Sequence, residues 1–336
     1  MIMTIEEIER ACETSQVLDF SKHDLEAPTL SLTRMFYPLG FPVEVRTNSN
    51  EVLDLMAELW GNFEKQHDTE PIRSDVHVVE EGSTECPPAS VFRIMLPLLT
   101  AVADANNYSI VNLERNSVQI SISRATLQHR LYAKYHLLGT PGCCIATRLT
   151  TPVHAACVAL DGHGILLCGD SGAGKSTLSY ACARSGWTYI CDDGLYLKNC
   201  GSGRVGTGDC HHVRFRPSAA ELFPEVQGLD LTPRAAGKPS IELSTAPMSY
   251  VTRAQSTHID FIVFLNRRAG EMPELLPYPA DAARQWMRQG LYGLPETLAA
   301  QYKTINRLLT AEVLELRYSD LDWAVDRLRT LVREGH

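Results

Sequence analysis

Short segments in which apolar and polar residues alternate dominate the first part of this chain of 336 residues. Such alternation predicts β-strands, because successive side chains of a strand point to opposite faces. An Asn48-x-x-Glu51 pattern predicts the start of an amphipathic helix through Trp60. We therefore expect a small α+β domain over residues 1–140, with helices over 5–12, 51–60 and 127–138 and strands over 41–46, 76–79, 90–96, 108–113 and 117–122.

Strand-like and helix-like segments alternate more regularly after Gly139-Thr-Pro-Gly142, which we take as the domain boundary. Several consecutive strands have no helix between them, so we expect a mixed sheet in an α/β domain over residues 141–336. The predicted strands cover 153–160, 165–168, 187–191, 211–215, 240–244, 259–265 and 313–316. The predicted helices follow residue 175, span 219–226, centre on 298–308, and begin after a cap at Ser319.

Composition narrows the class of protein. Hydrophobic residues make up 44% and charged residues 21%, which is typical of a globular protein. A net charge of −9 and the lack of a polybasic tract argue against a nucleic-acid partner. No apolar run approaches the roughly twenty residues of a membrane span, and the acidic N-terminus lacks the pattern of a signal peptide. We therefore expect a cytoplasmic protein that binds neither membranes nor nucleic acid.

The ten cysteines do not change this picture. Several lie inside apolar runs, where cysteine acts as a small hydrophobic residue. Cys143 and Cys144 are adjacent and lack the C-x-x-C spacing of a zinc or redox site. We expect neither disulfides nor a metal–cysteine site.

A glycine-rich motif carries the first functional signal. The letters G-x-x-x-x-G-K-S follow an apolar strand and precede a helical pattern, which is the context of a phosphate-binding P-loop. Backbone N–H groups of such a loop and the start of its helix point at phosphate oxygens. A glycine-rich turn without a ligand is the alternative. The predicted nucleotide contacts are Gly169, Asp170, Ser171, Gly172, Ala173, Gly174, Lys175, Ser176 and Thr177.

Two acids follow at the distance that a P-loop protein needs. Lys175 would hold the β- and γ-phosphates and the Ser176 hydroxyl would ligate Mg²⁺. Asp192 and Asp193 end the strand after the loop's helix, 17 and 18 positions beyond Lys175. One carboxylate would lean towards Mg²⁺ and the other would act as a general base. A polar strand end or a helix cap is the alternative.

The segment T-P-V-H-A-A-C-V-A-L-D-G-H-G-I-L-L-C-G-D-S-G-A-G-K-S-T, followed by W-T-Y-I-C-D-D, resembles the C-terminal domain of bacterial HPr kinase/phosphorylases. That domain also resembles the nucleotide domain of phosphoenolpyruvate carboxykinase. The resemblance implies a serine kinase that uses ATP and Mg²⁺, with Asp192 as base and His154 nearby. We further expect Asp193 to hold Mg²⁺ together with Ser176, and His154 to orient or tune Asp192. By itself, a histidine on an apolar strand such as His154 is more often a core residue.

The chain also departs from that family. The family's L-E-I-R-G-x-G signature, which supplies a metal-binding glutamate, is missing, and residues 210–217 stand in roughly its place. Glu242 is a candidate replacement for the glutamate, although it lies much further along the chain. The resemblance is firm over 151–198 and loose to about 270. We therefore expect a substrate other than HPr.

Arginines occupy alternate positions in the segment that replaces the signature. Arg214 and Arg216 would share one strand face, where they could grip a transferred phosphate or an acidic substrate. A solvated strand edge is an equally good interpretation. Arg267-Arg268, at another strand end, is a weaker candidate pair.

These observations predict an ATP- and Mg²⁺-dependent phosphotransferase that acts on a hydroxyl, first of all a serine of a protein or peptide encoded by a neighbouring gene. A kinase of a small-molecule hydroxyl and a nucleotide-binding regulatory module without turnover are the alternatives. The sequence leaves open the acceptor, the reverse phosphorylase reaction, the role of the N-terminal domain and the oligomeric state, including a homo-oligomer.

Overall fold

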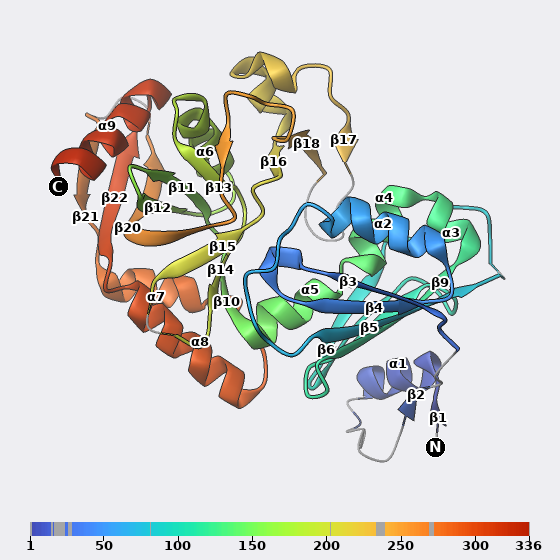
Figure 1. Ribbon diagram of the computed structural model, residues 1–336. Helices are drawn as coiled ribbons and strands as arrows, with labels where there is room; N and C mark the ends of the chain where they lie inside the picture. Colours follow the sequence, from blue (N-terminus) through green and yellow to red (C-terminus); the bar gives the residue numbers. More distant parts are fainter. Residues whose placement is uncertain are drawn as a thin grey trace. The chain divides into compact units, whose positions relative to one another are not determined.

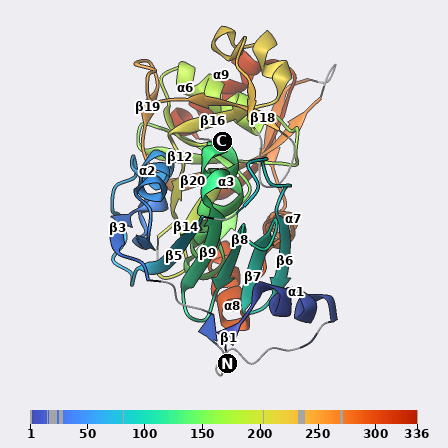
Figure 2. The same cartoon turned by 90° about the vertical axis from the view of Figure 1, so that its right-hand side faces the viewer.

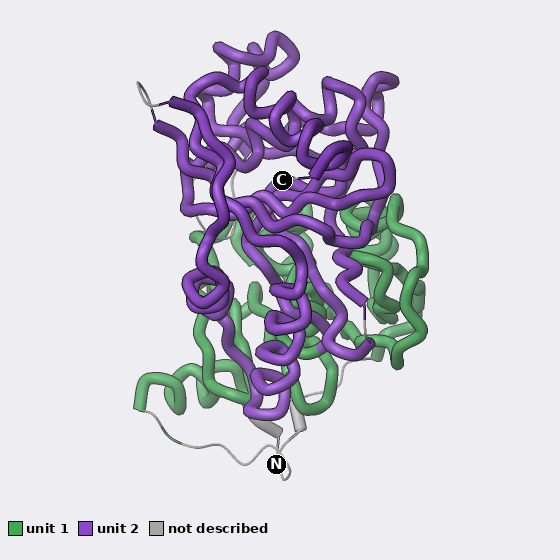
Figure 3. The backbone as a smooth tube through the Cα atoms, turned by 90° about the vertical axis from the view of Figure 1, so that its left-hand side faces the viewer, with its two compact units in different colours: residues 1–148, 233–238 green, residues 149–232, 239–336 purple. Residues whose placement is uncertain are grey.

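The computed structural model describes residues 2–14, 16, 24–25, 29–80, 82–201, 203–232, 239–268 and 272–335. Contacts divide the chain into two compact units, coloured separately in Figure 3. Unit 1 comprises residues 1–148 and 233–238, and unit 2 comprises 149–232 and 239–336. The division after residue 148 lies eight positions beyond the boundary expected from the sequence.

Unit 1 is built on a mixed sheet of seven strands in the order β3-β4-β5-β9-β8-β7-β6. Figure 2 shows β5, β9, β8, β7 and β6 side by side. The pairs β4–β5 and β5–β9 are parallel and the other pairs are antiparallel. The strands are β3 (Leu32–Phe36), β4 (Val43–Thr47), β5 (Ile72–Val79), β6 (Val91–Met95), β7 (Leu98–Val102), β8 (Tyr108–Asn112) and β9 (Ser117–Ser123); two further short strands, β1 (Ile2–Met3) and β2 (Asp24–Leu25), pair with each other.

The helices of unit 1 differ in detail from the expected ones. The N-cap residue of α2 is Ser49, one position later than the expected Asn48. The single helix expected over 127–138 is broken at His129, whose ψ of 63° is not helical. The elements are α1 (Ile5–Thr14), a 3₁₀ turn (Pro38–Gly40), α2 (Asn50–Trp60), α3 (Arg124–Gln128), α4 (Arg130–Tyr132), a π-helical segment (Ala133–Leu138), α5 (Pro141–Cys144) and a second π-helical segment (Ile145–Leu149).

Unit 2 contains a mixed sheet, as the sequence predicted. Its central strands run in the order β21-β22-β20-β12-β11-β13-β19. β22, β20, β12 and β13 point the same way, whereas β11 runs against its neighbours β12 and β13. The strands are β11 (Ala156–Leu160), β12 (His163–Cys168), β13 (Thr188–Cys191), β19 (Thr252–Arg253), β20 (Ser256–Arg267), β21 (Glu274–Pro277) and β22 (Glu312–Tyr318).

Two smaller groups of strands complete unit 2. β10 (Thr150–Val153), β14 (Leu195–Lys198) and β15 (Val205–Gly208) extend the sheet from the first residues of β20. β16 (His212–Phe215), β18 (Ser240–Ser244) and β17 (Leu231–Thr232) form a separate three-stranded sheet. Arg216 lies just beyond β16, and two 3₁₀ turns (Pro217–Glu221 and Pro224–Val226) replace the helix expected over 219–226.

Helices cover both faces of the main sheet of unit 2. α6 (Lys175–Arg184) and α9 (Leu321–Glu334) lie on one side, and α7 (Ala280–Arg288) and α8 (Pro295–Leu308) on the other (Figure 1). α7 was not predicted. α9 is capped by Asp320, whose carboxylate accepts a 2.7 Å hydrogen bond from the Trp323 amide, and not by Ser319. Among the described residues, none of the helices combines the length and the apolarity that a membrane crossing needs.

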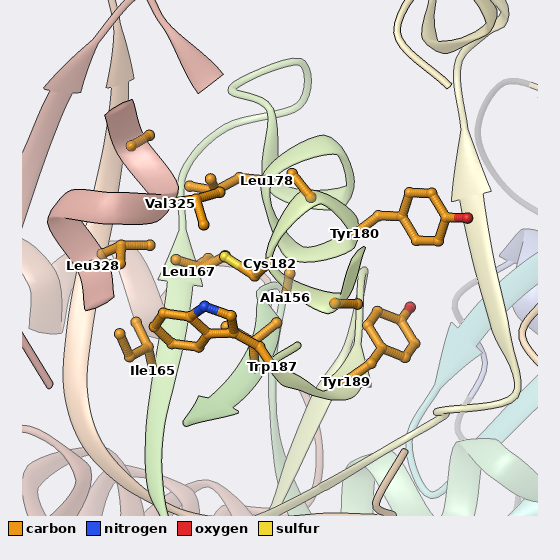
Figure 4. Close-up of a cluster of buried hydrophobic side chains, with 14 of the residues drawn as sticks. Ala156, Ile165, Leu167, Leu178, Tyr180, Cys182, Trp187, Tyr189, Val325 and Leu328 are labelled. Atoms are coloured by element: carbon orange, nitrogen blue, oxygen red, sulfur yellow. The ribbon is translucent and has the colours of Figure 1, made fainter. Parts of the chain in front are cut away.

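The side chains of β12 point alternately into two apolar clusters, one on each face of the main sheet. Ile165 and Leu167 face α6 and α9, whereas Leu166 and Cys168 face α7 and α8. Figure 4 shows Leu178 and Cys182 of α6 and Val325 and Leu328 of α9 gathered around Leu167, with Trp187 beneath them. These buried apolar contacts hold the end of β12, and the loop that follows it, against a rigid base.

Candidate functional site

The glycine-rich loop joins β12 to α6, in the predicted order of strand, loop and helix. Gly169, Gly172 and Gly174 have φ angles of 146°, 92° and 100°, a region that side-chain-bearing residues rarely adopt. A Cβ atom on Gly174 would lie 2.9 Å from the Tyr318 hydroxyl oxygen, and one on Gly169 would lie 2.9 Å from the Ala173 Cβ. The backbone curl therefore depends on glycine at both ends of the loop.

Lys175 closes the loop from inside. Its ammonium group donates to the carbonyl oxygen of Gly169 at 2.7 Å and to that of Asp170 at 3.2 Å, and the residue is only 6% exposed. Burial lowers the pKa of Lys175, although the carboxylates of Asp193 and Asp192 oppose that shift. The ammonium group of Lys175 is thus held by two carbonyl oxygens of the glycine-rich loop.

Asp192 directly follows β13 and is 6% exposed. Burial raises the pKa of its carboxyl group to about 6, and the neighbouring charge of Asp193 acts in the same direction. The Arg214 amide donates to Asp192 Oδ2 at 2.8 Å, and this bond, like the hydrogen bond with the Ser176 hydroxyl, acts to lower that pKa. Asp192 is therefore a buried carboxyl group held beside the first residues of α6.

Asp193 faces a different partner. Its Oδ1 lies 3.4 Å from His154 Nδ1, and the two side chains are 38% and 55% exposed. The sequence-based prediction joined His154 to Asp192 and Ser176 to Asp193. In the structure Asp193 lies beside His154 and Asp192 beside Ser176, and both acids occupy a bend that directly follows β13. The buried acid contacts the loop's serine, and the accessible acid contacts the histidine.

One edge of the sheet collects these groups for a topological reason. β12, β13, β20 and β22 are parallel, so their carboxyl ends meet at the same edge. β11 runs the other way, and so His154, which precedes it, reaches that edge as well. Among the candidate residues, the structure thus brings together Lys175, Ser176, Asp192, Asp193 and His154.

The two candidate arginines have different surroundings. Arg214 lies on β16 with its guanidinium group 2.9 Å from Glu242 Oε2 on β18. Arg216 is exposed and lies outside the strand, so the shared strand face that the sequence predicted is not present. Glu242, the candidate for the missing family glutamate, is therefore the ion-pair partner of Arg214.

The structure adds a residue that sequence reasoning missed. Trp286 of α7 donates its indole N–H to Asp170 Oδ1 in the glycine-rich loop, at 3.1 Å. Its ring packs edge-on against Phe264 of β20, with centroids 5.3 Å apart. No local pattern marks Trp286, because it lies 116 positions from its loop partner and α7 was not expected.

A cavity of about 620 Å³ opens beside the start of α6. Gly174 and Thr177 line it next to the loop, and Tyr318 lines it from the end of β22. Arg184 lies on its wall, with its guanidinium carbon 5.6 Å from the centre of the Phe223 ring. The cavity combines apolar and charged walls and lies next to the glycine-rich loop.

Comparisons with known proteins give limited information. No family model matches the chain, and no curated protein matches it. Among solved structures, the "Hpr(Ser) kinase/phosphatase from Coxiella burnetii" matches with a TM-score of 0.31 and 14% sequence identity. That match covers 54% of this chain and 93% of the other chain. The function of this chain must therefore be inferred from the geometry of the site itself.

Proposed function

We propose that this chain is a kinase that transfers the γ-phosphoryl group of ATP to a hydroxyl group, in a reaction that depends on Mg²⁺. One observation carries the proposal: a single sheet edge holds a glycine-rich loop closed by Lys175, and two aspartates with different surroundings. Phosphoryl transfer needs this combination, because its catalysis consists mainly of positioning and charge stabilisation.

The loop residues would hold the phosphates. Breaking the two carbonyl contacts of Lys175 frees its ammonium group for the β- and γ-phosphates, while the N–H groups of the loop and of the α6 terminus face the same anion. The cavity beside Gly174 and Thr177 would take the nucleoside, since it adjoins the loop and offers both apolar and polar walls.

The donor set fits Mg²⁺ at Ser176 and Asp192. A hydroxyl and a carboxylate in contact are the hard oxygen ligands that this ion takes in kinases, where phosphate oxygens and waters supply the rest. When bound, Mg²⁺ would neutralise charge on the phosphates. Asp192 replaces Asp193 here as the proposed ligand, because it is Asp192 that contacts the Ser176 hydroxyl.

Asp193 would then act as the general base, with His154 orienting it. Its carboxylate is 38% exposed and can reach an acceptor, whereas Asp192 is buried. Asp193 takes the proton of the acceptor hydroxyl, whose oxygen forms a bond to the γ-phosphorus as the bond to the bridging oxygen breaks. This exchanges the roles that we expected from the sequence, because the contacts of the two acids are exchanged.

A serine of a protein or peptide remains our proposed acceptor. A small-molecule hydroxyl is the second candidate, and a nucleotide-binding module without turnover is the third. Arg216, which is exposed at the end of β16, is the better placed of the two arginines to meet an acidic acceptor, because Arg214 is paired with Glu242.

The test compares three variants in one assay with labelled ATP, Mg²⁺ and proteins encoded beside this chain. We expect Lys175→Ala to lose nucleotide binding, since the loop then lacks the ammonium group that meets the phosphates. Asp193→Asn should bind ATP with unchanged Kd and transfer at least about 100-fold more slowly, as for the loss of a general base.

Asp192→Asn separates the two assignments of the aspartates. We expect this variant to need more Mg²⁺ for half-maximal ATP binding, whereas Asp193→Asn should not. If Asp192→Asn keeps the wild-type Mg²⁺ dependence and loses transfer alone, the sequence-based assignment of Asp192 as base is correct. ATP binding with no label on any protein, peptide or free serine would favour the module without turnover.

A further inference from the structure

β16, the strand whose Arg214 amide donates to Asp192, is an edge strand of the three-stranded sheet. Among the described strands β16 pairs with β18 alone, so its other side is open to contacts of a different kind. On that side the Arg214 amide donates to Asp192 Oδ2. Tyr189 of β13 also donates its hydroxyl to the carbonyl oxygen of His212 at 2.9 Å, which ties β16 to the strand that directly precedes Asp192.

The Arg214 side chain contacts a different acid from the one that its own amide contacts. Arg214 and Glu242 lie directly opposite each other in the β16–β18 register. Both Nε and Nη2 of Arg214 lie 2.9 Å from Glu242 Oε2, and the two side chains are 25% and 16% exposed. A partly buried pair with this geometry holds one rotamer of the arginine more firmly than an exposed pair does.

A guanidinium group close to Asp192 competes with any cation that Asp192 is to hold. The positive charge of Arg214 acts to lower the pKa of the Asp192 carboxyl group. Loss of the Glu242 carboxylate would remove the ion pair that holds the Arg214 guanidinium group on β18, while the Arg214 backbone amide would still contact Asp192. His212 also lies near Glu242, with Nε2 4.0 Å from Oε1, but it is further away than Arg214.

We propose that Glu242 is a positioning residue that holds the Arg214 guanidinium group away from Asp192, so that the Asp192 carboxylate stays available for the divalent cation of the transfer reaction. This inference deepens the proposed function and rests on it. Glu242 acts through Arg214, with which it forms the ion pair, and so its effect on the cation is indirect.

The first experiment titrates Mg²⁺ with Glu242→Gln. Loss of a residue that supports a metal ligand typically changes metal affinity or activity by about 10- to 100-fold. We expect the Mg²⁺ concentration for half-maximal transfer to rise by about that factor, with an unchanged Kd for ATP measured in EDTA. Glu274→Gln is the matched control, because Glu274 also faces an arginine across two strands, Arg317, at 3.9 Å. An equal effect of both variants would overturn the proposal.

The second experiment asks whether Arg214 mediates the effect. The double variant Arg214→Gln/Glu242→Gln keeps the amide at position 214 and removes the competing guanidinium group. We expect it to recover Mg²⁺ dependence to within about 3-fold of wild type, although Glu242→Gln alone does not. A double variant as poor as Glu242→Gln, or worse, contradicts the mechanism. That outcome would instead make Arg214 a substrate-binding residue or Glu242 a direct ligand.

A third measurement does not depend on turnover. Thermal unfolding of wild type, Asp192→Asn, Glu242→Gln and Asp192→Asn/Glu242→Gln forms a cycle between positions 192 and 242. We expect Asp192→Asn to raise Tm less in the Glu242→Gln background, because there the Arg214 guanidinium group, no longer paired with Glu242, would contact Asp192. Additive Tm shifts overturn the inference. Absence of ATP binding by the wild-type chain would instead overturn the proposed function, and the cycle would still decide the role of Glu242.

Discussion

Asp192 shows how strongly one residue's surroundings decide its chemistry. The residue is 6% exposed, and burial raises the pKa of its carboxyl group to about 6 from an ordinary value of 3.8. At about 1.4 kcal/mol for each pH unit, this shift corresponds to an unfavourable free energy on the order of 3 kcal/mol for the ionised form in the folded chain. Such a carboxylate is retained at a cost in stability, which is typical of functional sites.

The first prediction follows from the sign of that shift. The folded chain binds the Asp192 proton more tightly than the unfolded chain, so the free energy of unfolding falls as pH rises from about 4 to about 6. Above that window the full penalty is present. We expect Asp192→Asn to stabilise the protein at pH 8, by up to about 3 kcal/mol, and to have little effect near pH 4.

Urea denaturation at both pH values measures this difference. Asp281→Asn is a suitable control, since the Asp281 side chain is 92% exposed. The same change in stability at pH 4 and pH 8 would show that the effect of Asp192→Asn comes from packing and not from charge.

At the scale of one element, α6 lies between two glycines in the left-handed region. Gly174 precedes it with φ of 100° and Gly186 follows it with φ of 88°. The space around them differs, because a Cβ on Gly174 would meet the Tyr318 hydroxyl at 2.9 Å, whereas one on Gly186 would meet nothing within 4 Å. An alanine at position 174 therefore tests the conformation of the loop, whereas an alanine at position 186 tests only the end of α6.

The second prediction compares these two positions. Gly186→Ala should destabilise the protein by about 1 kcal/mol, the cost of the left-handed conformation, and leave ATP binding intact. Gly174→Ala should cost more and weaken ATP binding at least about 10-fold, because the loop must open to relieve the contact with Tyr318. Thermal unfolding and calorimetric titration with ATP measure both effects. Equal ATP affinity in the two variants would mean that the Gly174 conformation does not shape the nucleotide site.

At the scale of the whole molecule, every proposed catalytic and nucleotide-binding residue belongs to unit 2. The two apolar clusters that flank its main sheet also contain only residues of unit 2. The proposed nucleotide site therefore lies beside apolar clusters of its own unit. We propose that unit 1 has another task, such as the recognition of an acceptor.

The third prediction concerns a fragment with residues 149–336. We expect it to fold and to bind ATP with a Kd within about 3-fold of that of the full chain, because core and loop are both retained. Phosphorylation of a protein acceptor should fall more than ATP binding if unit 1 recognises that acceptor. Circular dichroism and calorimetry check the first expectation. A folded fragment without ATP affinity would show that unit 1 is part of the nucleotide site.

Local patterns predicted the elements that surround the site. The apolar run that ends at Cys168, the glycines of the loop and the helical spacing after Lys175 each depend on neighbours a few residues away. The same holds for β22 and α9, although the cap of α9 moved from Ser319 to Asp320. α7 did carry a local signal, since good helix formers place the buried Ala283 and Met287 four positions apart, but we did not predict it. The break at His129 has no such signal in the helical spacing around it.

By itself, the sequence determined that a strand, a glycine-rich loop and a helix follow one another. It also determined that two acids, Asp192 and Asp193, come at the end of the strand that follows this helix. Only the tertiary structure decided which acid meets which partner. Asp192 contacts Ser176 and the Arg214 amide, Asp193 contacts His154, and Glu242 takes the Arg214 side chain. The reason is physical: strand register and the parallel order of β12 and β13 bring these residues together, and neither is encoded in the spacing of nearby residues.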